Sequence, residues 1–158
     1  MMNLSVLVNK VRKFLKVSWT DKMMIIEAVF LTGIIRFSIL FVAFSKIAKL
    51  SGKYNKDSVF SINNKQISIG NRIGLVVQIV SKYTPWESKC LVKALTAQTM
   101  LRIRKIPSTV YLGVAKDDKK LVAHAWLRCG ENIITGGDEC YGFTMVAKFA
   151  NHIGKVRE

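Results

Sequence analysis

The chain has 158 residues, half of them hydrophobic, so we expect one compact domain or one domain with a helical appendage. Its 25 Lys and Arg against 10 Asp and Glu give a formal charge of +15, which favours an acidic peptide, an anionic membrane surface or nucleic acid as partner. No RNA-recognition signature and no zinc-finger spacing accompanies this charge, so nucleic acid is not expected.

The N-terminal third of the chain is predicted to be helical. Between residues 4 and 17, apolar side chains recur at helical spacing among basic ones, which indicates a short basic amphipathic helix. A longer helical run extends from Lys22 to about Leu50, where Ser51-Gly52 ends it, and Gly33 can divide it into a hairpin. We therefore treat residues 1–52 as an N-terminal helical region that docks a partner or lies on a membrane surface.

The stretch from Met23 to Ser45 is long enough to span a bilayer. Its 13 Ile, Leu, Val and Phe residues contribute roughly −6 kcal/mol to insertion, whereas Glu27 and Arg36 return about +5 to +6 kcal/mol. The balance is near zero. Burial within the protein, docking of a partner and association with a membrane surface therefore all stay open for this segment.

The cysteines indicate a reducing compartment. Cys90, Cys129 and Cys140 are an odd number without a disulfide-like spacing, and no cleavable signal peptide is recognisable. We therefore expect a cytoplasmic protein, with peripheral attachment to a membrane left open. There is no Cys-x-x-Cys, and His124 stands at no familiar zinc-ligand spacing from Cys129, so neither a metal nor a cofactor is expected.

The middle of the chain changes in composition. Residues 53–71 are rich in Asn, Lys, Ser and Gly with isolated apolar residues, which predicts an irregular connector. Residues 72–82 have helical spacing and are followed by Pro85, so a short helix is expected there. We place the catalytic domain at residues 72–158, because the residues that carry chemistry follow this proline.

Cys90 is the candidate nucleophile. Ser88 is a plausible N-cap, which would place Cys90 in the first turn of a helix that runs to about Ile106. Unpaired backbone N–H groups and the positive end of the helix dipole favour the thiolate there. A lone cysteine is, however, more often a small buried apolar residue, so Cys90 needs a partner to count as catalytic.

His124 is the candidate partner. Residues 109–115, 121–127 and 132–135 alternate like strands, and on the second of them Val122, His124 and Trp126 point to one face. A histidine at mid-strand between two alanines is a costly choice for a core and a suitable base opposite a helix start. Asp138, after the third strand, could accept the second ring N–H and fix the tautomer.

These residues lie within motifs that closely resemble the B-protein family of lasso-peptide biosynthesis. The motifs are Pro85-Trp86, Ser88-Lys89-Cys90-Leu91, Leu101 to Pro107, Leu112-Gly113-Val114 and Ala123-His124-Ala125-Trp126. That family consists of transglutaminase-like leader peptidases, and the resemblance covers residues 72 to about 149. It implies an α+β, papain-like core in which a helix carrying the cysteine packs on a small antiparallel sheet, with an N-terminal helical region.

The resemblance also implies partners. The chain is similar to the split form of the family, in which a separate small protein binds the leader of the precursor peptide. An ATP-using cyclase then closes the macrolactam ring. Nothing in the sequence resembles a winged-helix leader-binding domain.

The sequence departs from the family pattern at the triad acid. The family carries this acid about twelve residues after the histidine, and that position is Gly136 here. Asp138 is the nearest acid and the predicted one, while Asn132, Glu139 or a water molecule are alternatives. The Cys90 backbone N–H is expected to help hold the oxyanion, with Trp86 as a positional candidate for a second donor.

The expected function is therefore hydrolysis of one peptide bond in a lasso precursor by Cys90, His124 and Asp138. Two alternatives stay open. The same site could transfer the acyl group to an amine, as transglutaminases and arylamine acetyltransferases do. The chain could also be a non-catalytic, basic, membrane-associated adaptor with an inert cysteine.

Overall fold

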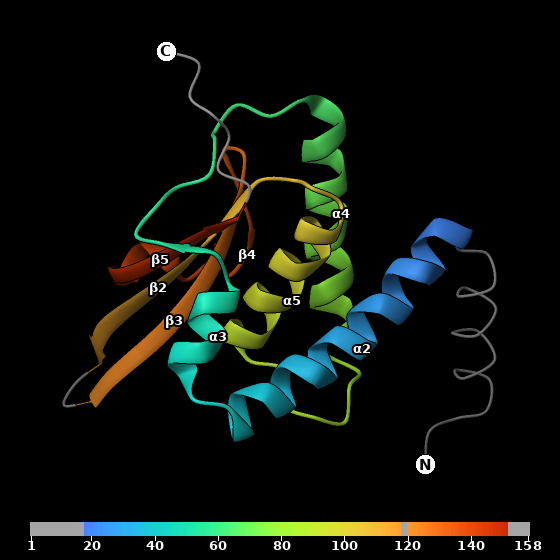
Figure 1. Cartoon of the computed structure of the whole chain (residues 1–158). Coiled ribbons are helices and arrows are strands. Elements are labelled where there is room, and N and C mark those ends of the chain that lie inside the picture. Colours follow the sequence, from blue (N-terminus) through green and yellow to red (C-terminus); the bar gives the residue numbers. More distant parts are fainter. Residues whose placement is uncertain (1–17, 118–119, 152–158) are drawn as a thin grey trace.

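The computed structural model describes residues 18–117 and 120–151, which form an α+β fold (Figure 1). The helix expected for residues 4–17 lies outside the described residues. The helices are α2 (Trp19–Phe41), α3 (Phe44–Leu50), α4 (Asn64–Val80), α5 (Cys90–Ile103) and the 3₁₀ turn η1 (Cys140–Gly142). The strands are β1 (Lys53–Tyr54), β2 (Ser108–Asp117), β3 (Lys120–Cys129), β4 (Asn132–Thr135) and β5 (Thr144–Asn151).

The strands form one antiparallel sheet in the order β1-β5-β2-β3-β4. β2 and β3 pair along nearly their whole length, from Thr109 opposite Arg128 to Asp117 opposite Lys120. β4 covers only the last part of β3, because its pairing begins where Thr135 faces Leu127. The first half of β3, which carries His124, is therefore free of β4, and the loop after β4 can reach it.

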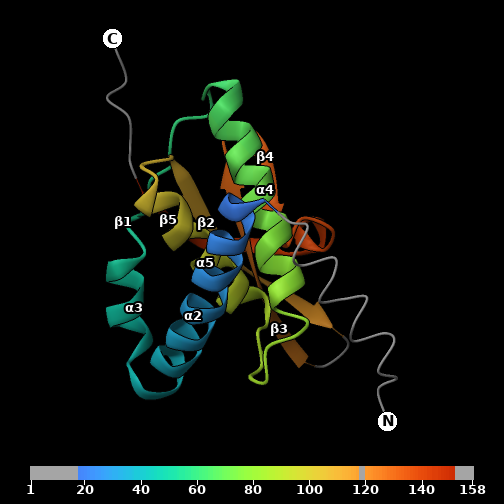
Figure 2. The ribbon, with the colours of Figure 1, turned by 90° about the vertical axis from the view of Figure 1, so that its right-hand side faces the viewer.

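The helices cover one face of the sheet in two layers. α5 packs on β2 and β3, α4 lies beside it against β4, and α2 crosses both on the outer side, as Figure 2 shows. The core between sheet and helices contains Ala125 and Leu127 of β3. Opposite these, Leu101 comes from α5 and Val77 from α4. The predicted fold class, with a cysteine-bearing helix on a small antiparallel sheet, is confirmed.

The three strands predicted from alternating residues are confirmed, but two helix boundaries differ from the expectation. The N-terminal run breaks at Val42 and Ala43 rather than at Gly33. Gly33 lies buried within α2, where a Cβ atom would come within 3.1 Å of the Trp86 ring. The glycine therefore permits close packing against Trp86 and does not form a turn.

The segment 53–71 is not an irregular connector throughout. Helix α4 begins at Asn64, eight residues before the expected start, because Asn63 and Gln66 form a capping box. The Asn63 side chain accepts a 2.9 Å hydrogen bond from the Gln66 backbone N–H, and the Gln66 side chain accepts one of 3.2 Å in return. This capping box stabilises the first turn of α4. The residues of that turn are mostly polar, so the spacing of apolar residues does not predict it.

A second polar cluster fastens the loop before α4 to the other face of the sheet. Asp57 accepts hydrogen bonds from Tyr111 of β2, Arg128 of β3 and Lys148 of β5. Burial by itself would raise the pKa of Asp57, but the bonds from Lys148 and Tyr111 and the nearby positive charges lower it below its usual value. The ionised carboxylate therefore ties three strands and one loop together.

The two charges of α2 that weigh against a membrane span are both used within the fold. Glu27 forms two hydrogen bonds with Arg104, of 3.0 and 2.7 Å, and Arg36 bonds Glu87 at 3.0 Å. By length and composition alone α2 could cross a bilayer, which is weak evidence for a span. A buried stripe on α2 also packs on α4 and α5; it comprises Met24, Ala28, Thr32 and Gly33.

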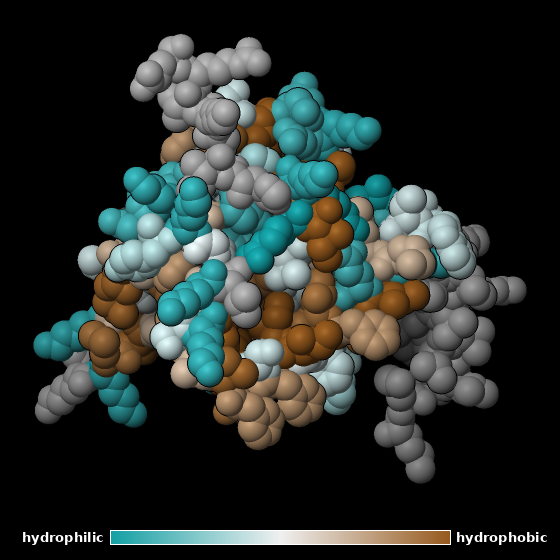
Figure 3. Space-filling model, in the orientation of Figure 1, coloured by the Kyte–Doolittle hydropathy of each residue, from teal (hydrophilic) through white to brown (hydrophobic). Residues whose placement is uncertain are grey.

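The opposite side of α2 is apolar and exposed. Its most exposed large side chains are Trp19, Phe30, Ile34, Phe37, Leu40 and Phe41. Figure 3 shows apolar side chains gathered along the lower part of the molecule, where α2 and α3 lie. A contiguous apolar surface of this kind is typical of an interaction site rather than of scattered surface residues.

Candidate active site

Cys90 is the first residue of α5, so it lies in the first turn of a helix, as predicted. The N-cap is Lys89 rather than Ser88, because the Ser88 hydroxyl is turned toward the Thr84 hydroxyl, 3.2 Å away. No side chain caps the helix, so the first N–H groups of α5 stay available to a negative charge. The half-buried Cys90 thiol therefore lies at a position that favours a thiolate and an oxyanion.

The His124 side chain is held in place from several sides and is only 7% exposed. Its ring stacks on Trp126, with centroids 6.0 Å apart, and is tilted against Phe143 at 5.0 Å. Its Nε2 atom lies 2.9 Å from the carbonyl oxygen of Gly136. Because a carbonyl can only accept a hydrogen bond, Nε2 carries the proton and Nδ1 of the neutral ring is left as the base.

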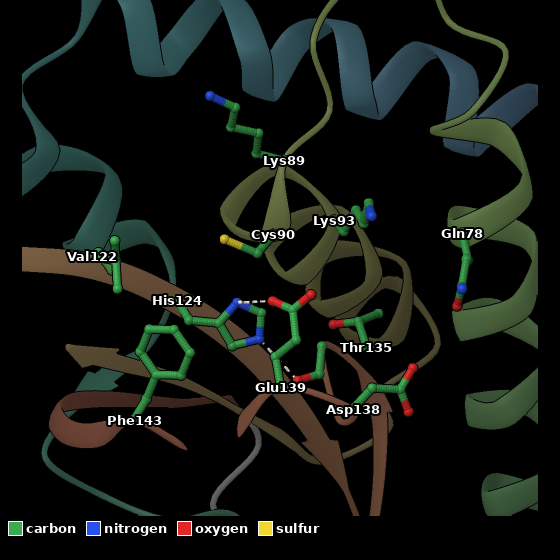
Figure 4. Close-up of a pocket in the computed structure, with 12 residues that line it drawn as sticks. Gln78, Lys89, Cys90, Lys93, Val122, His124, Thr135, Asp138, Glu139 and Phe143 are labelled. Carbon is green, nitrogen blue, oxygen red and sulfur yellow. Dashed lines mark hydrogen bonds and ion pairs between the residues drawn. The ribbon is translucent and has the colours of Figure 1, made fainter. Parts of the chain in front are cut away.

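Cys90 and His124 line the same pocket, which has a volume of about 480 Å³. α5 supplies one wall of this pocket, β3 the second, and the loop after β4 the third. Figure 4 shows the Cys90 sulfur on the side of the imidazole that carries Nδ1, while Nε2 points to the Gly136 carbonyl. The arrangement can pass a proton from a thiol to a base at the end of a helix.

The predicted contact between Asp138 and His124 is absent from the described residues. Asp138 lines the pocket, but the carboxylate nearest the ring is that of Glu139, whose Oε2 atom lies 3.6 Å from Nδ1. The third candidate, Asn132, bonds Asn71 at 3.4 Å instead. Asp138 therefore lies in the pocket without touching the base, and its catalytic role stays a prediction.

Trp86, the positional candidate for a second oxyanion donor, lies elsewhere. Its ring packs against Gly33 of α2, and it is not among the residues that line the pocket. Its indole Nε1 is buried and has no hydrogen-bond partner among the described residues. The structure thus gives Trp86 a place between α2 and the start of α5 rather than at the reacting centre.

Two groups in the pocket were missed from the sequence. The Gly136 carbonyl gave no side-chain signal, although its twelve-residue interval from His124 marked the position. The second group is Thr135, which lines the pocket and is only 7% exposed. Its hydroxyl has no hydrogen-bond partner among the described residues. Figure 4 shows this hydroxyl pointing to the side on which His124 lies.

The other two cysteines do not line the pocket. Cys129 is buried against Gly70 of α4, and burial raises the pKa of its thiol to about 11, even though the nearby Arg128 charge lowers it. The Cys140 thiol donates a hydrogen bond of 3.1 Å to the Gly137 carbonyl. Among residues 18–117 and 120–151, no group of three or more His, Cys, Asp and Glu side chains could hold a metal ion.

A family model matches most of the chain. The model for the transglutaminase-like superfamily matches residues 34–148, a stretch that contains Cys90, His124 and the loop after β4. The match begins within α2, so it includes only the C-terminal part of the helix that crosses the outer layer. No curated protein and no solved structure matches the chain.

Proposed function

The chain belongs to the transglutaminase-like superfamily, and from this premise we propose that it is a cysteine peptidase with Cys90 as nucleophile and His124 as general base. The observation that carries the proposal is the shared pocket, which is lined both by a thiol at a helix start and by an imidazole whose Nε2 is engaged by a carbonyl. The superfamily includes both cysteine peptidases and acyltransferases, so the acceptor of the acyl group needs its own test.

In the proposed mechanism, Nδ1 of His124 takes the proton from the Cys90 thiol, and the thiolate attacks the carbonyl carbon of the scissile peptide bond. The Cys90 backbone N–H stabilises the oxyanion that forms. When the C–N bond breaks, the imidazolium returns its proton to the leaving amine and a thioester remains on Cys90. His124 then removes a proton from water, whose oxygen attacks the thioester and releases the carboxylic acid and the free thiol.

We propose the leader region of a lasso-peptide precursor as the substrate. Support comes from the motifs around Cys90 and His124 that resemble the lasso B-protein family, together with the superfamily match. Cleavage would free the N-terminal amine of the core peptide for a separate ATP-using cyclase. The pocket is not an enclosed cavity, so an extended peptide could reach Cys90 and His124 from outside.

We further propose that a small leader-binding protein presents this substrate. A peptidase with an open site gains rate when its substrate is held in register. The exposed apolar face of α2 is the proposed docking surface, because it is the largest row of exposed aromatic and aliphatic side chains in one described helix. An anionic membrane surface is the competing occupant of that face, and the protein would then be peripheral to the membrane.

The proposal is tested with the full chain, together with a candidate precursor peptide and a candidate leader-binding protein sought among the neighbouring genes. Mass spectrometry should detect two fragments whose summed mass exceeds the precursor by one water, which identifies hydrolysis. Added primary amine should not be incorporated, because incorporation would indicate acyl transfer. Intact precursor with the wild-type protein and its partner, under conditions where Cys90 is reactive, would refute the peptidase.

The docking surface is tested with a point substitution rather than by removing α2. Phe37→Ser changes a side chain that is 58% exposed and should weaken partner-stimulated cleavage while leaving alkylation of Cys90 unchanged. Lys65→Ser, which changes an exposed residue at the start of α4, is the control. Binding of wild type and Phe37→Ser to vesicles of anionic lipid tests the alternative that this face binds a membrane. If Phe37→Ser loses vesicle binding but keeps full partner stimulation, the face binds a membrane and does not dock the partner.

A further inference from the structure

We infer that the main-chain carbonyl of Gly136 positions His124 in place of a carboxylate. This inference rests on the proposed function in that His124 is taken as the base. The triad acid of a cysteine or serine hydrolase holds the imidazole in the tautomer that leaves the other nitrogen free. In this chain the only group within hydrogen-bond distance of Nε2, among the described residues, is the Gly136 carbonyl oxygen at 2.9 Å.

Neither carboxylate near the ring is placed to accept a hydrogen bond from His124 Nε2. Glu139 approaches Nδ1, the nitrogen that must accept the Cys90 proton, and its side chain is 73% exposed. Asp138 makes no hydrogen bond or ion pair with His124 in the part of the chain that the structure describes. Orientation through Nε2 is therefore left to the backbone.

The backbone conformation at residue 136 brings the chain close to His124 and requires glycine. Gly136 has a φ of +72°, a left-handed conformation that side chains disfavour. A Cβ atom there would lie 2.6 Å from the Ala125 carbonyl oxygen and 3.0 Å from His124 Nε2. The first of these neighbours is backbone of β3, which cannot move without disturbing the sheet. A side chain at position 136, an aspartate included, would therefore displace either the loop or the imidazole.

The register between β3 and β4 places the Gly136 carbonyl next to the His124 ring. β4 ends at Thr135, which pairs with Leu127 of β3, so the next residue passes directly over the strand that carries His124. Because β4 stops there, the Gly136 carbonyl is not used in the ladder and can accept from the imidazole. His124 is also clamped by Trp126 and Phe143, so a single hydrogen bond is enough to select one ring orientation.

A neutral acceptor has a chemical consequence. A carbonyl fixes the tautomer as a carboxylate does, but it does not neutralise the positive charge that His124 gains when it takes the thiol proton. In this chain the Gly136 carbonyl therefore orients the His124 ring but does not compensate the positive charge that the ring gains. Gly136 is accordingly a positioning residue that acts through His124.

The test measures the proton on Nε2 directly. His152→Gln in the full-length protein leaves His124 as the chain's only histidine, and ¹⁵N-histidine labelling then reports both ring nitrogens by NMR. We expect a slowly exchanging Nε2–H resonance that persists in Asp138→Asn and in Glu139→Gln. It should be lost in Gly136→Ala and kept in Gly142→Ala, whose added Cβ meets no atom within 4 Å.

A second measurement follows the consequence for the thiol. In Gly136→Ala the alkylation of Cys90 by iodoacetamide should slow at least about tenfold at neutral pH, because His124 is no longer oriented to accept the thiol proton. Cleavage should fall by about 10²- to 10⁴-fold, as when a triad loses the right tautomer.

Loss of the Nε2–H resonance in Asp138→Asn or Glu139→Gln, or its survival in Gly136→Ala, would overturn the inference. Should Gly136→Ala fail to fold, the two carboxylate variants still decide between an acid and the carbonyl. The inference and the proposed function fail separately. A wild-type protein that keeps the resonance and the reactive Cys90 but never cleaves a precursor would refute the peptidase alone.

Discussion

The ion pair between Glu27 and Arg104 gives a quantitative test of whether α2 belongs to the folded domain. Two hydrogen bonds of 3.0 and 2.7 Å join the guanidinium to the carboxylate, and the two side chains are only 22% and 25% exposed. Charge-assisted bonds of this kind contribute about 1.5–3 kcal/mol when buried, whereas exposed pairs contribute about 0.2–1 kcal/mol. For a pair a quarter exposed we expect a coupling free energy of about 2 kcal/mol.

The assay is a double-mutant cycle on the full-length protein, with Glu27→Gln, Arg104→Gln and the double variant unfolded in urea. A coupling of about 2 kcal/mol corresponds to roughly thirtyfold in the folding equilibrium, and to a fall in melting temperature of about 4–8 °C for a chain of this size. The cycle is needed because Arg104 also bonds the Met100 carbonyl, so its single variant loses more than the pair.

The chain supplies a matched control in the pair between Arg36 and Glu87. It joins α2 to the segment before α5 by one bond of 3.0 Å, and its side chains are 25% and 48% exposed. Its coupling should stay below about 1 kcal/mol. A Glu27–Arg104 coupling no larger than that of the control pair would refute the view that α2 is locked into the core by a desolvated charge pair.

Four further outcomes follow from the structure. Cys90→Ala and His124→Ala should be equally inactive, because nucleophile and base act as a unit, and a partly active His124→Ala would contradict this. In the native protein iodoacetamide should modify Cys90 and spare Cys129, whose pKa is raised to about 11, as peptide mapping would reveal. Asp57→Asn should destabilise the protein at neutral pH, and its difference from wild type in urea unfolding should shrink below about pH 4, because a lowered pKa stabilises only while the carboxyl is ionised. A chain that starts near Tyr54 should lose cooperative thermal unfolding, since it lacks the buried part of α2; a sharp transition in that fragment would disprove the packing argument.

Local patterns carried much of the fold. A helix that begins close to Cys90 and the strands around His124 could be predicted, because both depend on the local spacing of apolar residues. The start of α4 was not predicted from the sequence, because its first turn is polar and is stabilised by two capping side chains, Asn63 and Gln66. Strand β5 was missed for a different reason: its place between β1 and β2 is decided by pairing over most of the chain, which no local window records.

The candidate site divides in the same way. The places of Cys90 at a helix start and of His124 on a strand could be predicted, because the neighbouring residues determine these elements. The acceptor for Nε2 could not, since every residue has a carbonyl and only the three-dimensional path after Thr135 brings that of Gly136 to the ring. A missing acid at the expected interval was the single available sign.

The place of β5 bears on the order in which the molecule assembles. β1 has no neighbour in the sheet except β5, and Lys53 pairs with Ala150 from the far end of the described chain. Contacts between such distant positions form late, because closing a long loop costs entropy before any contact repays it. The hairpin of β2 and β3, the short turn to β4 and the helix α5 are neighbours in sequence, so they can assemble early. The proposed catalytic groups thus belong to the part of the protein with short-range contacts, and we expect the opposite edge of the sheet to close afterwards.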